Sequence, residues 1–176
     1  MLFFKFMKLK EEFVAEIRVL NRLRHPNVTT LMGAVLDDID GPLLIMEYMD
    51  LGSLFDILHD ETNVLGQVLL HPILTGISQG MRFLHASDPL VIHGDLKARN
   101  ILVDSRYHAK VADFGLSQSH KESKRIVGTP FWMAPELLRG ESGNTTSSDM
   151  YSFGILLYEV YSRKLPYENE EPATVL

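Results

Sequence analysis

The stretch HGDLKARN at residues 93–100, followed by DFG at residues 113–115, decides the fold of this chain. It places Asp95 two residues before Lys97 and five before Asn100, and a second acid, Asp113, follows two short apolar runs. The apolar runs can anchor the polar loop in a core. Carboxylates, an amide and an amine at these offsets are what a site for a metal-bound phosphate requires.

Asp95 by itself has a second interpretation, because a buried aspartate often only caps a turn or accepts from backbone amides. The residues around Asp95 favour a catalytic or ligand-binding role instead. Lys97 and Asn100 lie between Ile92 and Ile101, so the three polar groups must leave the core together on one tight loop. Such a loop presents an acceptor for a hydroxyl proton, a cation for a phosphate and an amide oxygen for a metal.

Size and composition narrow the class of protein. The 176 residues, 45% of them hydrophobic, suffice for one globular unit with its own core. The formal net charge of −6 argues against a nucleic-acid partner, which would reward clustered Lys and Arg. The lack of cysteine excludes disulfides and thiolate sites and fits a reducing compartment. No apolar run is long enough for a signal peptide or a membrane span, so we expect a cytoplasmic chain without membrane insertion.

The first half of the chain mixes helix and strand. Apolar spacings of three and four predict a helix over residues 8–24, ended by Pro26. Two β-type runs, 28–36 and 43–48, predict a hairpin. Ser53 then predicts the cap of a short helix ending near residue 59.

The second half is mainly helical. Pro72 predicts the first turn of a longer helix, with an apolar stripe to residue 84. The other expected elements are strands at 101–103 and 109–112, a mobile loop at 118–127, and a helix at 148–162 in the middle of the core. This order predicts an α+β chain with two unequal lobes.

The motifs resemble those of the eukaryotic protein kinases. Residues 93–100 resemble the catalytic loop of that family, and DFG at 113–115 resembles its magnesium-binding motif. GTPFW at 128–132 is similar to the substrate-docking loop, APE at 134–136 to the end of the activation segment, and DMYSFG at 149–154 to the start of the central large-lobe helix. The resemblance runs from about Glu11 to Pro166 and is closest to the tyrosine-kinase-like Ser/Thr group.

The resemblance implies a bilobal protein-kinase-like fold. Residues 1–176 would form a single partial domain, with residues 1–49 as the remnant of the small lobe and hinge and residues 50–176 as an incomplete large lobe. The small lobe would contain a helix and antiparallel strands, and the large lobe would be mainly helical. Asp149 would bond the backbone near His93.

The resemblance also implies the site residues, with ATP and Mg²⁺ as cofactors and a protein as substrate. Asp95 would orient the attacking hydroxyl and Lys97 would steady the γ-phosphate, while Asn100 and Asp113 would hold magnesium. The residues implied for the nucleotide are Glu47 and Met49, whose backbones would bond adenine, Leu102, which would pack under the ring, and Glu16, which would pair with the family's strand lysine. For Glu16 the alternative is an ordinary solvated helix glutamate.

Three features of the sequence refine this expectation. In this family Lys97 and the pair Gly128-Thr129 are typical of Ser/Thr specificity, whereas Ala98-Arg99-Asn100 resembles the tyrosine-kinase version, and we favour Ser/Thr. Gly94 replaces the family's phosphate-reading arginine, so we hypothesise that activation does not depend on phosphorylation of the 117–129 loop. The glycine-rich loop and strand lysine are not recognisable before the first helix, and the helices expected after Pro166 are missing. We therefore expect a fragment with low or no activity alone.

Two other functional classes compete with an ATP- and magnesium-dependent protein kinase. One is a non-catalytic kinase-like regulatory module, such as that of a membrane guanylate cyclase, and the other is a scaffold or pseudogene product. Such regulatory modules usually lack the catalytic aspartate, whereas Asp95, Asn100 and Asp113 are all present here. The intact set favours the enzyme.

Overall fold

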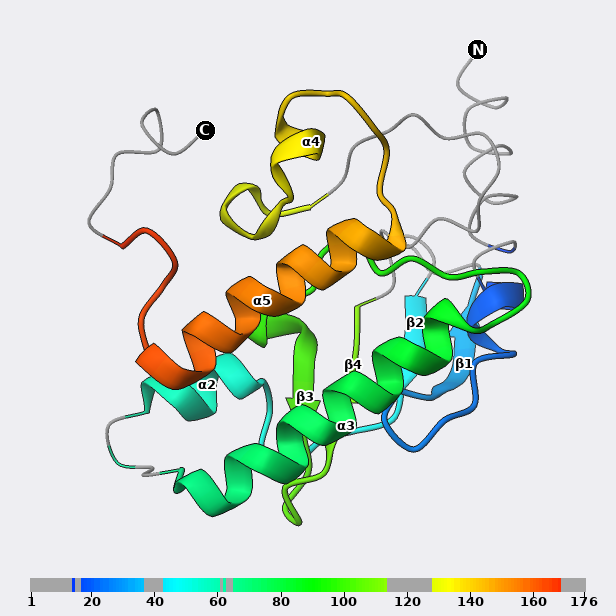
Figure 1. The fold of residues 1–176 in the computed structure, drawn as a ribbon. Coiled ribbons are helices and arrows are strands. Elements are labelled where there is room, and N and C mark those ends of the chain that lie inside the picture. The colour runs from blue at the N-terminus through cyan, green and yellow to red at the C-terminus, as the bar shows by residue number, and fades with distance from the viewer. Residues whose placement is uncertain are drawn as a thin grey trace.

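The computed structural model describes residues 14, 17–36, 43–60, 62, 65–113 and 128–168 of the chain. Short antiparallel sheets and longer helices alternate in it, which confirms the predicted α+β class (Figure 1). The elements are β1 (Leu31–Val35), β2 (Leu43–Met46), α2 (Leu54–His59), α3 (Gln67–His85), the 3-10 turn η1 (Ala98–Asn100), β3 (Ile101–Val103), β4 (Ala109–Val111), the 3-10 turn η3 (Pro130–Trp132), α4 (Pro135–Leu138) and α5 (Thr146–Ser162).

The strands form two separate antiparallel pairs, β1 with β2 and β3 with β4 (Figure 1). The first pair confirms the predicted hairpin, although its turn at 37–42 lies outside the described residues. Residues 27–29 run beside β4, where the Thr29 N–H donates to the Val111 carbonyl at 2.9 Å and the Val111 N–H donates to the Asn27 carbonyl at 2.9 Å. These bonds tie the first part of the chain to the strand that leads into the DFG motif.

Helix α3 carries the predicted apolar stripe, since Ile73, Ile77, Met81 and Leu84 are all buried. Its start was wrongly predicted: the helix begins at Gln67, and Pro72 lies inside it. A proline there removes only one hydrogen bond, to the carbonyl four residues earlier. That carbonyl belongs to the first turn, next to solvent, where water can replace the lost donor.

Two glycines let α3 approach the segment beside β4. A Cβ on Gly80 would lie 2.4 Å from the Asn27 carbonyl oxygen, and one on Gly76 would lie 2.7 Å from Asn27 Nδ2. The two positions are four residues apart and share one face of the helix. Backbone therefore packs almost directly on backbone here.

Helix α5 begins with a capping box, in which the Ser148 N–H donates to Thr145 Oγ1 at 3.1 Å and the Thr145 N–H donates to Ser148 Oγ at 2.8 Å. It ends at Ser162, and the C-cap residue Arg163 adopts a left-handed conformation with φ of 54°. The expectation of a helix surrounded by core is wrong for one side: Ser152, Leu156 and Glu159 are buried, whereas the exposed side carries Met150, Tyr158 and Tyr161. The buried residues recur at spacings of three and four, so they share one face.

The helix predicted for residues 8–24 is described only in part. Residues 14 and 17–20 are helical, and a turn follows at 21–22, so the helix ends before Leu23. Leu20 and Leu23 are buried as its spacing predicts. Within the described residues, no helix has both the length and the apolar character needed to cross a membrane.

Candidate active site

Apolar residues anchor the loop at residues 93–100 in the core. Leu96 and Ala98 have no exposed surface, and η1 leads directly from the loop into buried Ile101 of β3. The polar side chains at 95, 97 and 100 are thereby forced towards the same side as the segment at 128–129. Apolar residues that are buried alternate along this loop with polar residues, and the polar side chains together form the site.

His93 is a fixed neutral part of this loop. It is fully buried, and burial lowers the pKa of its imidazole although the nearby Asp149 opposes the shift. Its Nδ1 accepts from the Asp95 N–H at 3.2 Å, so the proton lies on Nε2, which donates to the Ala112 carbonyl at 2.9 Å. One ring therefore connects the loop to the residue before Asp113.

Asp149 holds the start of the loop from α5. It is 1% exposed, and its carboxylate accepts the N–H groups of His93 and Gly94, both at 2.9 Å. This confirms the bond implied for Asp149. Gly94 has φ of +80°, a backbone conformation that costs glycine little. A residue with a side chain could adopt this turn only with backbone strain.

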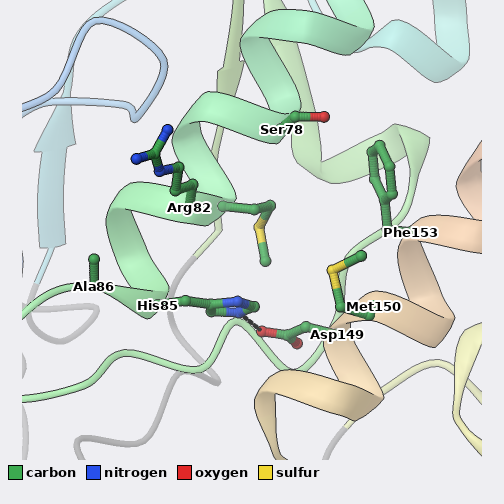
Figure 2. A pocket seen from close by; sticks show the side chains of 8 residues that line it. Ser78, Arg82, His85, Ala86, Asp149, Met150 and Phe153 are labelled. Atoms are coloured by element: carbon green, nitrogen blue, oxygen red, sulfur yellow. Dashed lines mark hydrogen bonds and ion pairs between the residues drawn. The ribbon is translucent and has the colours of Figure 1, made fainter.

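His85 is an unpredicted partner of Asp149. Figure 2 shows its ring pointing from α3 towards Asp149 on α5. The His85 Nε2 lies 2.8 Å from Asp149 Oδ2, and both residues line a pocket of about 460 Å³. The two residues are 64 positions apart, and nothing in the sequence links them. The pair braces α3 against α5 behind the loop at residues 93–100.

Asp95 is the centre of the site and is 5% exposed. Its Oδ2 accepts from Lys97 Nζ at 2.6 Å and Asn100 Nδ2 at 3.1 Å. Its Oδ1 accepts from the N–H and the hydroxyl of Thr129, at 2.8 and 2.7 Å. The Thr129 oxygen in turn accepts from Lys97 Nζ at 2.6 Å. The structure thus brings together both predicted catalytic residues, one predicted metal ligand and Thr129, whose contact with the carboxylate was not predicted.

Asn100 and Asp113 carry oxygen donors of the kind that Mg²⁺ prefers. Asn100 donates its amide N–H to the Asp95 carbonyl at 2.8 Å, which turns its amide oxygen away from that carbonyl. The Ala112 N–H donates to the backbone carbonyl of Asn100 at 2.9 Å. Asp113, the next residue after Ala112, is exposed. The described residues contain no cluster of three His, Cys, Asp or Glu side chains suited to a metal. An amide and a carboxylate still fit Mg²⁺, which usually takes few protein ligands and completes its shell with water and phosphate oxygens.

The residues predicted to bind adenine lie where β2 ends. The Glu47 N–H donates to the Thr30 carbonyl at 3.0 Å, so of its backbone groups only the carbonyl can face a nucleotide. The Met49 N–H makes no hydrogen bond to another described residue. Leu102 is half-buried on β3 and pairs with Ser53 just after this segment.

The Glu47 side chain has a partner that the sequence did not reveal. Its carboxylate accepts from Lys110 Nζ at 2.7 Å and from the Thr30 N–H at 2.6 Å. Burial alone would raise the pKa of Glu47, but these two donors outweigh it and lower the pKa. The ion pair joins β4 to the end of β2.

Glu16 lies outside the described residues, and so does the 117–127 loop. Their predicted roles stay predictions.

Comparisons with known proteins identify the family. Residues 5–175 match the family model "Protein kinase domain". The chain is 42% identical over 163 residues to the "Probable serine/threonine-protein kinase drkC" of Dictyostelium discoideum, covering 89% of this chain and 22% of that protein. It is 40% identical over 171 residues to the "Serine/threonine-protein kinase CTR1" of Arabidopsis thaliana, covering 94% of this chain and 21% of that protein. The chain thus spans about a fifth of the length of these relatives, and the resemblance drawn from its motifs is confirmed.

Proposed function

The chain belongs to the protein kinase family, and from this premise we propose that it transfers the γ-phosphate of ATP to serine and threonine hydroxyls of proteins. The observation that carries the proposal is the buried Asp95 carboxylate, held by Lys97, Asn100 and Thr129. A carboxylate fixed in this way can orient a hydroxyl and accept its proton. Positioning of this kind supplies most of the catalysis in phosphoryl transfer.

Lys97 makes the Asp95 carboxylate available to a substrate. A carboxylate has about four lone-pair positions, and four donors already occupy those of Asp95. A substrate hydroxyl must therefore replace one of them. When Lys97 turns from Oδ2 to the γ-phosphate of ATP, it frees an acceptor position beside the phosphate to be transferred.

Asn100 and Asp113 are proposed to hold the magnesium that accompanies ATP. When bound, the metal neutralises charge on the phosphate oxygens. The amide oxygen of Asn100 and the carboxylate of Asp113 supply its protein ligands. The Glu47 carbonyl and the Met49 N–H are proposed to bond adenine above Leu102, with Glu16 pairing the strand lysine.

Thr129 supports hydroxyl amino acids as acceptors. Its own hydroxyl donates to Asp95 Oδ1 and accepts from Lys97, so the site already accommodates an aliphatic hydroxyl between these two groups. A tyrosine hydroxyl lies further from its own backbone, so a tyrosine substrate would need a deeper pocket around Asp95. We therefore propose serine and threonine as acceptors.

We also propose the two-lobed arrangement, with residues 1–49 in the small lobe and hinge and residues 50–176 in the large lobe. The two separate sheets support it, because β1–β2 precedes residue 49 and β3–β4 follows it. The expectation of low or no activity from these 176 residues alone stays a prediction.

The test is phosphoamino-acid analysis. The natural full-length protein is incubated with γ-labelled ATP, Mg²⁺ and a mixture of peptides that contain serine, threonine or tyrosine. We expect the label on serine and threonine. Label on tyrosine alone, or none on any peptide, would overturn the proposal.

A further inference from the structure

Arg99 is an exposed cation in the loop at residues 93–100 that the proposed chemistry does not use. Its two neighbours are buried, since Ala98 has no exposed surface and Asn100 is 6% exposed. The chain therefore turns only the Arg99 side chain outward at this point. The Arg99 guanidinium lies over the ring of Phe55 on α2, with its Cζ 3.7 Å from the ring centroid. An aromatic face attracts a cation above it, so the ring holds the guanidinium in place.

The guanidinium of Arg99 is held in this way but has no acidic partner. None of the ion pairs between described residues includes Arg99. Asp56, the residue after Phe55, is bonded instead to the Ser53 hydroxyl at 2.6 Å. Glu159 senses the charge of Arg99 but has no exposed surface and forms no ion pair with it. Stacking occupies one face of the guanidinium, so the N–H groups along its edge remain available to a ligand.

This cation lies next to Asp95, on the side of the site that faces α2. The side chains of Lys97 and Asn100 reach back to the Asp95 carboxylate. Arg99 stands between them in the chain and points to α2 instead. Thr129 contacts the same carboxylate from a different segment of the chain. A substrate hydroxyl placed at Asp95 therefore brings the substrate residues on one side of it close to Arg99.

The length of chain between the two residues limits which substrate positions Arg99 can contact. Arg99 lies four residues after Asp95, and four residues span at most about 14 Å even when fully extended. An extended substrate advances by about 3.3 Å per residue. A substrate side chain that reaches Arg99 must therefore lie within about four positions of the hydroxyl that is phosphorylated.

The chemistry of this position favours a carboxylate. A guanidinium presents its N–H groups in a planar arrangement that matches the two oxygens of a carboxylate, and a stacked arginine loses little further freedom on binding. General electrostatic attraction does not produce the same preference, because the chain has a formal net charge of −6, which repels acidic peptides. A preference for acidic substrates must therefore come from a local cation.

We propose that Arg99 is a specificity-determining residue that binds a carboxylate of the protein substrate. The chain accordingly prefers serine and threonine residues that have Asp or Glu within about four positions on one side. The inference rests on the proposed kinase function and names the substrate class of that site. The competing explanation is that Arg99 only packs α2 against η1, in which case the acidity of the substrate makes no difference to transfer.

The first test uses the natural full-length protein and a set of serine peptides. Each peptide carries one Glu at one of the four positions on either side of the serine, and a matched peptide carries Gln at the same position. We expect kcat/KM for the Glu peptide to exceed that for its Gln partner by about three- to fivefold, at one or two positions on one side only. Equal values for every pair would overturn the proposal.

The second test changes the charge of Arg99. Arg99→Met keeps an unbranched side chain that can pack on Phe55 but removes the cation, so the Glu-to-Gln ratio of kcat/KM should fall to about one. Arg99→Glu should reverse the preference, so that a Lys peptide becomes better than its Gln partner at the same position. An acidic preference that persists in Arg99→Met would overturn the proposal.

Arg106→Met is the matched control for net charge. Arg106 is also exposed, and it lies between β3 and β4. This variant removes the same charge as Arg99→Met, and we expect it to keep the wild-type Glu-to-Gln ratio. An equal loss of the ratio in both variants would show a long-range charge effect and would overturn the role of Arg99.

A binding measurement separates this inference from the proposed function. The best Glu peptide is made with alanine in place of serine, so that it cannot be phosphorylated, and its Kd is measured by fluorescence anisotropy. Arg99→Met should raise the Kd by about three- to fivefold. An unchanged Kd would overturn the proposal. A wild-type protein that phosphorylates none of the serine peptides but shows this change in Kd would count against the proposed function alone.

Discussion

At the scale of single residues, Gly94 sets the shape of the loop at residues 93–100. Its φ of +80° lies in the left-handed region, where a side chain costs roughly 1–2 kcal/mol. We expect Gly94→Ala and Gly94→Arg to lower the free energy of unfolding by about that amount, as measured by chemical denaturation. Gly140→Ala is the positive control, because Gly140 has φ of +68° and no atom within 4 Å of a Cβ, so backbone strain alone should give a similar loss there. If Gly140→Ala destabilises the protein and Gly94→Ala does not, the account of this turn is wrong.

The pKa of Glu159 gives a pH-dependent prediction at the same scale. Because burial raises its pKa in the folded state, the folded protein keeps this proton to a higher pH than the unfolded chain, whose reference value is 4.5. The stabilising contribution of the neutral acid is complete below that pH and is lost as the pH rises through the folded-state pKa.

Glu159→Gln does not titrate, so its stability relative to wild type should increase as the pH rises from about 4.5 to 8. Denaturation curves of both proteins across this pH range measure the difference in unfolding free energy. The other titratable groups are the same in both proteins, so their contributions cancel. A difference that does not change with pH would contradict the raised pKa.

At the scale of elements, the contact of α3 with residues 27–29 depends on Gly80. Gly80→Ala would place its Cβ 2.4 Å from a backbone oxygen, which must move, so we expect a loss of about 1–3 kcal/mol in unfolding free energy. Gly154→Ala on α5 is the control, because nothing lies within 4 Å of its Cβ. That substitution should stabilise the protein by roughly 0.5–1 kcal/mol. Equal effects at the two positions, measured by thermal or chemical denaturation, would contradict the close packing.

Elements were predictable where local chemistry determines them. Ser53 caps α2 through a hydrogen bond to the Asp56 N–H, as its residue type predicts. The start of α3 was not predictable, because Pro72 is equally compatible with a first turn and with an interior position close to solvent. The exposed side of α5 was missed for a related reason: its sequence is apolar almost all round, so the pattern does not say which face is buried.

At the scale of the whole molecule, the site was predictable as far as its residues lie close in sequence. Asp95, Lys97 and Asn100 share one loop, and the structure brings them together. Lys110, His85 and Glu159 were missed because their partners are 63, 64 and 61 positions away, and no periodicity connects such pairs. Asp149 was predicted only through the family resemblance, which supplies long-range contacts that spacing cannot.

The central claim is that Asp95 carries phosphoryl transfer to a protein hydroxyl. It is tested most directly by comparing the natural full-length protein with its Asp95→Asn variant in single-turnover transfer from ATP and Mg²⁺ to a serine peptide. Asparagine keeps the size and one acceptor oxygen of Asp95 but replaces the other oxygen with an NH2 group and cannot accept the proton. We therefore predict a loss of transfer by roughly a hundredfold or more with ATP binding retained. Equal transfer by the two proteins would contradict the account.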